Sequence, residues 1–338
     1  MKLGTIVQAK YFNGVADPEE SSKYQSLLKG NFSQVGMFAF GQMPFIAKGP
    51  DPEKDYDWKN TDALVEFGSS NSVEILYNTV INSQENSFPD WYKKLSPIDK
   101  EKALEKHVKT VVERYRGRIK IFKLVNEAFR FSEENFYGTN ESRPALIAKI
   151  FSWAKEEYQE GVFMLNDHIP FLKNDELRIA YINLISSIKK AGAPIDVVGI
   201  EGHLGYRPTP FQLPPDDEIN LALDEIHAAA KCPIHITEFD LSYNNDPVKN
   251  HPGSRIETNQ SFFCQGVEYD NWFDYQAYAY KHFYNVCSTK NYVENLVFWG
   301  FRDDSKITWE RPGTGFFNED FSPKPVFRVM EPVLTKSK

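Results

Sequence analysis

The sequence predicts an α/β protein folded as a (β/α)8 barrel, and three observations favour this fold. The chain has 338 residues, which is long for an ordinary domain but typical of one barrel. Short β-branched or apolar runs alternate with helical patterns along it. Acidic and amide side chains follow several of these runs, where barrel strands carry functional groups. We expect a single catalytic domain over residues 1–338, and a doubly wound open sheet is the alternative architecture.

Eight runs have the length and composition of buried parallel strands. In chain order they are Leu3–Val7, Val35–Phe40, Val73–Val80, Ile119–Val125, Val162–Leu165, Val197–Ile200, Ile234–Phe239 and Leu296–Phe301.

Three of the intervening helices have clear start or stop signals. Ser96 can cap a helix whose first residue is Pro97. A second helix starts around residues 174–175 and ends in two lysines followed by Gly192, a combination that commonly terminates helices. The third follows residues 214–216. No stretch resembles an interdomain linker, which fits one domain.

Composition and charge exclude several classes of protein. The net charge is −8 and the sequence has no basic stripe, so we expect no nucleic-acid partner and a neutral substrate rather than a polyanion. Three cysteines, an odd number without close pairing, argue against a disulfide framework and a zinc motif, and a single bridge stays open. No run has transmembrane length, so we expect no membrane partner. The first residues lack a signal-peptide hydrophobic region, which indicates an intracellular protein or a secreted one whose leader is not in this chain. The oligomeric state stays open.

Two glutamates give the strongest chemical signal. Glu127 ends the run Ile-Phe-Lys-Leu-Val-Asn-Glu, and Glu238 lies near the end of Ile-His-Ile-Thr-Glu-Phe-Asp. Most glutamates are surface residues or members of structural ion pairs, but these two follow apolar strands directly. A glycosidase needs two such carboxyl groups, one to protonate the leaving oxygen and one to attack or support the sugar carbon.

Other polar residues fit the same site or a different one. Asp240 shares a strand face with Glu238, and His203 could offset the repulsion between them. A metal site formed by Asp167, His203, Glu238 and Asp240 is a weaker interpretation, because their spacing matches no metal motif. The sequence has neither a phosphate-binding glycine loop nor a Gly-x-Ser-x-Gly segment, so we expect no metal, no cofactor and no serine nucleophile.

Several segments, in this order along the chain, resemble glycoside hydrolase family 10, the retaining β-1,4-xylanases. The segments that carry the resemblance are Leu124–Phe129, Leu165–Asp167, Gly199–Leu204, Ile236–Asp240, Phe298–Asp303 and Pro323–Pro325, together with Trp309. The resemblance implies a retaining glycoside hydrolase, with endo-β-1,4-xylanase action on xylan or a related plant polysaccharide as the best single expectation.

The resemblance also implies a role for individual residues. Glu127 would be the acid/base and Glu238 the nucleophile, with Asn126 on the sugar 2-hydroxyl, His203 on the nucleophile and Asp240 in support. The remaining residues expected to bind substrate are Trp299, Trp309, Asn78, Asn166 and Gln42.

The sequence departs from the family pattern on the side that binds the non-reducing part of the substrate. Where the family has Glu, Asn and Lys after the second strand, this chain has Phe38, Ala39 and Gln42. Two family histidines are replaced by Asn78 and Asn82. We therefore hypothesise that plain xylan is not the best substrate. The alternatives are a non-xylan glycoside, a decorated oligosaccharide, or a non-catalytic carbohydrate-binding relative.

Overall fold

The computed structural model describes residues 1–84, 87–129, 134–204, 212–241, 262–264, 266–304 and 313–334. Eight parallel strands close into a barrel in the order β13-β1-β2-β3-β4-β7-β8-β10, with β10 paired back to β13. The barrel strands are β1 (Lys2–Val7), β2 (Gln34–Met37), β3 (Glu74–Asn82), β4 (Ile121–Asn126), β7 (Val162–Asp167), β8 (Val197–Ile200), β10 (Ile234–Leu241) and β13 (Val293–Phe298). The structure thus confirms the predicted (β/α)8 barrel.

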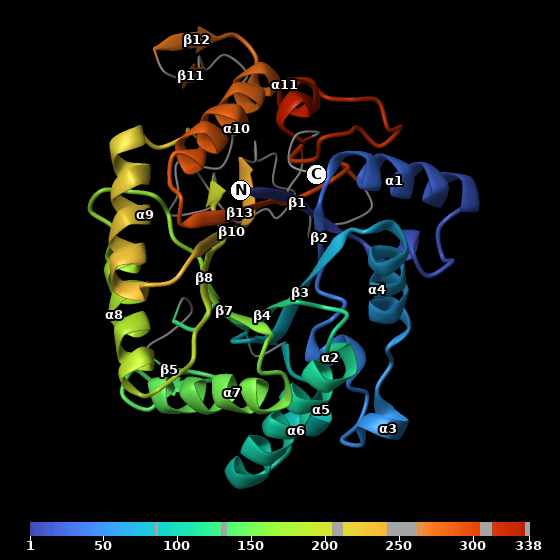
Figure 1. Cartoon of the computed structure of the whole chain (residues 1–338), viewed down its shortest axis with the longest axis vertical. Helices are drawn as coiled ribbons and strands as arrows, with labels where there is room; N and C mark the ends of the chain where they lie inside the picture. Colours follow the sequence, from blue (N-terminus) through green and yellow to red (C-terminus); the bar gives the residue numbers. More distant parts are fainter. Residues whose placement is uncertain are drawn as a thin grey trace.

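Helices surround the barrel, and Figure 1 shows them outside the ring of strands. The longer ones are α1 (Pro18–Asn31), α4 (Lys59–Asn71), α6 (Pro97–Tyr115), α7 (Arg143–Glu157), α8 (Glu176–Lys190), α9 (Asp216–Ala230), α10 (Trp272–Ser288) and α11 (Pro325–Leu334). Short elements are η1 (Ala9–Tyr11), α2 (Met43–Ile46), α3 (Pro52–Asp55), α5 (Asp90–Lys93), β9 (His203–Leu204), and the hairpins β5 (Glu134–Asn135) with β6 (Gly138–Thr139) and β11 (Phe262–Cys264) with β12 (Val267–Tyr269).

The helix signals in the sequence are confirmed. The Ser96 hydroxyl accepts a hydrogen bond from the backbone N–H of Asp99 at the start of α6. Asp175 caps α8 in the same way, and α9 starts at Asp216. These caps satisfy N–H groups that have no partner inside the helix.

Two predicted strand positions were wrong. The second strand ends at Met37 rather than Phe40, and Ala39 adopts a left-handed backbone with φ +50°. The last strand is Val293–Phe298, three residues earlier than predicted. In both places aromatic residues beyond the strand end extended the apolar run, because they line a cavity or pack in the core without belonging to the sheet.

The barrel interior is built in layers. An apolar layer near the amino-terminal end consists of Ile6, Leu76, Ile121, Met164, Val197 and Val297. Side chains two residues apart lie on the same face of a strand, so the next inward positions are Gln8, Asn78, Lys123, Asn166, Gly199 and Trp299. The barrel therefore changes from apolar to mainly polar toward its carboxyl end.

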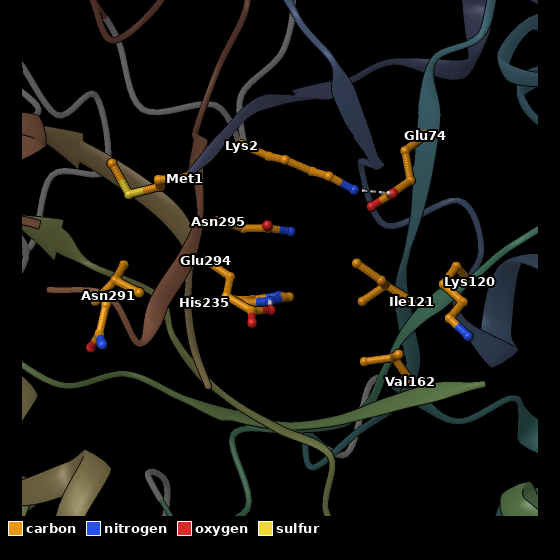
Figure 2. A pocket seen from close by; sticks show the side chains of 11 residues that line it. Met1, Lys2, Glu74, Lys120, Ile121, Val162, His235, Asn291, Glu294 and Asn295 are labelled. Atoms are coloured by element: carbon orange, nitrogen blue, oxygen red, sulfur yellow. Dashed lines mark hydrogen bonds and ion pairs between the residues drawn. The ribbon is translucent and has the colours of Figure 1, made fainter. Parts of the chain in front are cut away.

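The amino-terminal mouth of the barrel holds a cavity of about 560 Å³ below the apolar layer. Figure 2 shows Lys2 directed toward Glu74, with which it forms an ion pair of 2.6 Å. His235 lies 3.6 Å from the carboxylate of Glu294 in the same cavity. Two of its charged groups, Lys2 and Glu74, are thus paired with each other. Among the described residues, no helix is both long and apolar enough to cross a membrane.

Candidate active site

A cavity of about 710 Å³ lies at the opposite, carboxyl-terminal end of the barrel. Parallel strands present their carboxyl ends at one edge, so residues far apart in sequence meet there. Seven residues singled out from the sequence line this cavity: Gln42, Asn78, Asn126, Glu127, His203, Glu238 and Trp299.

Glu238 is held by two donors from different strands. The Nζ of Lys123, on β4, donates to Oε1 of Glu238, and Lys123 has no exposed surface. The Nε2 of His203 lies 3.0 Å from Oε2. Each carboxylate oxygen of Glu238 thus has its own partner, which fixes the plane of the group.

These partners keep Glu238 ionised. Burial alone would raise the pKa of Glu238, but the Lys123 ammonium and the hydrogen bond from His203 outweigh it and lower the pKa to about 2. A nearby cation and a donor to the charged form both favour the carboxylate. Glu238 is therefore an anion at neutral pH, as a nucleophile must be.

His203 connects Glu238 to a second buried carboxylate. Its Nδ1 lies 3.0 Å from Oδ2 of Asp240, which is fully buried. The two contacts at opposite ring nitrogens set the orientation of the imidazole. Asp240 therefore supports the site from beneath, while His203 lines the cavity itself.

Glu127 reaches the cavity from an unusual backbone conformation. Its φ is +52°, in the left-handed region that few residues other than glycine adopt, and its N–H donates to the carbonyl of Asn166. The Nε2 of Gln84 donates to Oε2 of Glu127 at 2.9 Å. Left-handed backbone of this kind is concentrated at functional sites, where the surrounding structure enforces it.

Asn166 lies beneath the cavity and not on its wall. Its Nδ2 donates to Oδ1 of Asn126 at 2.7 Å, and its Oδ1 accepts from the hydroxyl of Thr237 at 2.8 Å. Asn166 is completely buried and is not among the residues that line the cavity, so its contact with substrate stays an expectation. It holds Asn126, which does line the cavity.

Of the two tryptophans, only Trp299 lies within the described residues. Its ring makes an edge contact with His203 at a centroid distance of 5.4 Å and lies 5.3 Å from the ring of Phe38. Trp309 lies outside the described residues. Trp299 therefore forms an aromatic wall next to the Glu238 network.

Four acidic or histidine residues bear on the metal interpretation. Asp167 accepts hydrogen bonds from the backbone of residues 129 and 168, so it caps a loop. Glu201, His203 and Glu238 each have a donor atom within 4.8 Å of the others, a set that could hold a metal ion. However, the Lys123 ammonium already bonds Glu238 and would repel a second cation there.

Sequence reasoning missed Lys123 and Gln84. Lys123 interrupts an otherwise apolar strand, Ile-Phe-Lys-Leu-Val, and a charge at an inward position of such a strand needs a buried partner. That signal could have identified it. Gln84 has no comparable signal, because it follows the end of β3 in a loop whose path the sequence does not specify.

A parallel barrel that brings two glutamates into one cavity at its carboxyl end has the architecture of a glycoside hydrolase. Comparison with known proteins supports the same class of enzyme. The model of glycosyl hydrolase family 10 matches residues 1–332. Endo-1,4-beta-xylanase B of Thermotoga neapolitana is 28% identical over 91% of this chain and 82% of its own length. Beta-1,4-xylanase of Dictyoglomus thermophilum is 26% identical over 90% and 82%.

Solved structures show the same fold. Xylanase 10B of Thermotoga maritima superimposes with a TM-score of 0.78 at 23% identity, covering 99% of this chain and 95% of that one. Xylanase 10B of Thermotoga petrophila, solved with xylobiose, gives a TM-score of 0.77 at 24% identity, covering 99% and 94%. The chain belongs to glycosyl hydrolase family 10 and is a glycoside hydrolase.

Proposed function

We propose that the protein is a retaining β-glycosidase in which Glu238 is the nucleophile and Glu127 the acid/base. One observation carries the assignment: both glutamates line one cavity, and a lysine and a histidine hold Glu238 there as an anion. The group held as an anion suits attack on the anomeric carbon. Glu127 is the other carboxyl group of the cavity and accepts a hydrogen bond from the Gln84 amide, so we assign proton transfer to it.

The reaction proceeds in two displacements. First, a Glu238 oxygen bonds to the anomeric carbon while the glycosidic bond breaks, and Glu127 donates its proton to the departing oxygen. Then Glu127 takes a proton from water, the water oxygen bonds to the anomeric carbon, and Glu238 departs as a carboxylate. Configuration is retained because the carbon is inverted twice.

Leaving-group dependence tests the two assignments. The Glu238→Ala variant should lose turnover on every β-glycoside, because no other group can attack. The Glu127→Ala variant should lose activity on alkyl or sugar leaving groups but keep much of the first step with a dinitrophenyl glycoside, which departs without a proton. Sugar binding that survives without any turnover in the unsubstituted protein would instead establish a carbohydrate-binding protein. Loss of turnover on metal removal would establish a metalloenzyme.

For the substrate, we propose a β-1,4-linked xylan or a related plant polysaccharide. The support comes from the relatives, which are named as xylanases. The wall on one side of the cavity is apolar, however: its residues are Phe38, Ala39, Phe40, Pro44 and Phe45. Such a wall offers few partners for sugar hydroxyls, and each missing hydrogen bond costs about 0.5–1.5 kcal/mol of affinity.

The apolar wall favours a second candidate, a glycoside that carries an apolar substituent next to the cleaved bond. Initial rates on plain xylan, acylated xylan and aryl β-glycosides would compare the two. We expect the substituted substrates to have the higher kcat/KM, and Phe40→Ser to reduce that preference. Cleavage of plain xylan with the highest kcat/KM of the panel would refute the second candidate and keep the first.

A further inference from the structure

Lys123 lies inside the barrel, two residues beyond Ile121 of the apolar layer and on the same strand face. Its side chain has no exposed surface. Its backbone carbonyl accepts the Thr79 hydroxyl at 2.7 Å, which ties this part of β4 to β3. The ammonium reaches across the barrel interior to Oε1 of Glu238 on β10.

A buried ammonium is costly unless a counter-charge accompanies it. Lys123 has that counter-charge in the Glu238 carboxylate, and the pair is almost completely removed from water, with side-chain exposures of 0% and 8%. In the part of the chain that the structure describes, the other titratable groups at this site start with His203, which bonds the second oxygen of Glu238, and Asp240 behind His203. Glu201 has an oxygen within 4.8 Å, and Glu127 lines the same cavity.

Covalent catalysis changes this pair during the reaction. In the glycosyl-enzyme, Glu238 is a neutral ester and Lys123 loses its counter-charge. When the ester bond between the anomeric carbon and the Glu238 oxygen breaks, the electron pair returns to that oxygen and restores the ion pair. Lys123 thus stabilises the free carboxylate relative to the ester.

We propose that Lys123 is a positioning residue for the second displacement: it makes the Glu238 carboxylate a better leaving group and so speeds release of the sugar from the enzyme. This inference rests on the proposed role of Glu238 as the nucleophile. It also implies a cost in the first displacement, because the same ammonium makes the carboxylate a weaker nucleophile. The low pKa of Glu238 is consistent with this arrangement.

The test is Lys123→Met, which keeps an unbranched side chain one atom shorter and removes the charge. With a dinitrophenyl glycoside, pre-steady-state measurements separate the two displacements. The ratio of the second rate constant to the first should fall by about tenfold, since one unit in the acidity of a leaving carboxylate corresponds to about tenfold in the balance of its two states. The burst of dinitrophenol should grow accordingly. The acid limb of kcat/KM should move to higher pH by about one unit, and Lys123→Arg should restore part of both effects.

Lys324→Met is a matched control. Lys324 is also buried, and its Nζ donates to Asp303 at 2.8 Å and to the carbonyl of Gly313 at 2.8 Å, away from Glu238. Its loss should lower the melting temperature and leave the ratio of the two rate constants and the acid limb in place. An unchanged ratio and acid limb in Lys123→Met would overturn the proposal.

A cycle of unfolding measurements covers the case in which Lys123→Met folds poorly. The double variant Lys123→Met/Glu238→Gln removes both charges, and its melting temperature should lie well above that of Lys123→Met alone. Additive losses would overturn the pairing without reference to activity. Full turnover by Glu238→Gln would overturn the proposed nucleophile instead, so the two failures are distinguishable.

Discussion

Replacement of Gly199 by alanine should displace Asn166, a buried side chain that holds a residue of the active-site cavity. Gly199 lies on β8, and a Cβ there would lie 2.2 Å from Oδ1 of Asn166 and 2.7 Å from the sulfur of Met164. Because Cβ atoms in real proteins do not approach other heavy atoms closer than 3.0 Å, the Asn166 side chain must move by roughly 1 Å. Glycine is thus required at this position for space, not for backbone conformation.

The magnitude follows from the contacts of Asn166. Its amide accepts from Thr237 and donates to Asn126, and both bonds are buried. Overpacking a core costs about 1–3 kcal/mol, and leaving a buried partner unsatisfied costs about 1–3 kcal/mol more. We expect Gly199→Ala to lose about 2–6 kcal/mol of unfolding free energy. With an unfolding entropy of roughly 0.7 kcal/mol/K for a chain of this length, the melting temperature should fall by about 3–9 °C.

Thermal unfolding followed by circular dichroism, together with turnover of an aryl β-glycoside, measures both consequences. Turnover should fall because displaced Asn166 shifts Asn126, the neighbour of Glu127. Gly30→Ala on α1 is the control, since no atom outside its own helix lies within 4 Å of the added Cβ. Adding Asn166→Ala to the Gly199→Ala variant should recover the overpacking part of the loss. A melting temperature within about 1 °C of the unsubstituted protein, with full turnover, would refute the reasoning.

Two further predictions concern stability. Burial lowers the pKa of His107 to about 4, below its unfolded value of 6.5, so its neutral form stabilises the fold above pH 6.5. This contribution of about 3 kcal/mol should be lost as the pH falls from 6.5 to 4; urea unfolding at several pH values should show a flatter profile for His107→Gln. Tyr181→Phe should cost about 1–2 kcal/mol, because the hydroxyl donates to the buried carbonyls of Leu165 and Gly199. Tyr278→Phe, at a side chain 51% exposed, should change the unfolding free energy little by comparison, and equal losses in the two would contradict the prediction.

The barrel itself could be predicted because its signals repeat. Each buried strand is a short apolar run, and three of the helices between them have recognisable ends. The ends of the strands were harder to predict, because an apolar run can contain both strand residues and residues that line a cavity beyond the strand. Phe38 and Phe40 extended the second run for this reason, although the chain leaves the sheet at Met37.

The site was accessible where a polar residue ends a strand, as with Glu127 and Glu238. Site residues were harder to predict where their role depends on contacts with other strands of the barrel. Asn166 was expected at the substrate, but it is completely buried, and its hydrogen bonds to side chains of other strands include one to Asn126. Contacts between side chains on different strands depend on register and twist, and the sequence of a single strand contains neither.

The layers of the barrel interior allow further inward-facing residues to be predicted from the sequence. Once the apolar layer is known, counting two residues along each strand gives the next inward layer, and this count reaches Lys123 as well as Asn78 and Trp299. A lysine at such a position lies too deep for its charge to reach water, so it requires an anion from another strand. Few acidic residues are available near the carboxyl ends of the facing strands, and Glu238 is one of them. The charge of Glu238, the proposed nucleophile, is thus set by a residue on another strand of the barrel. The apolar layer beneath both side chains limits the water that would otherwise weaken their interaction.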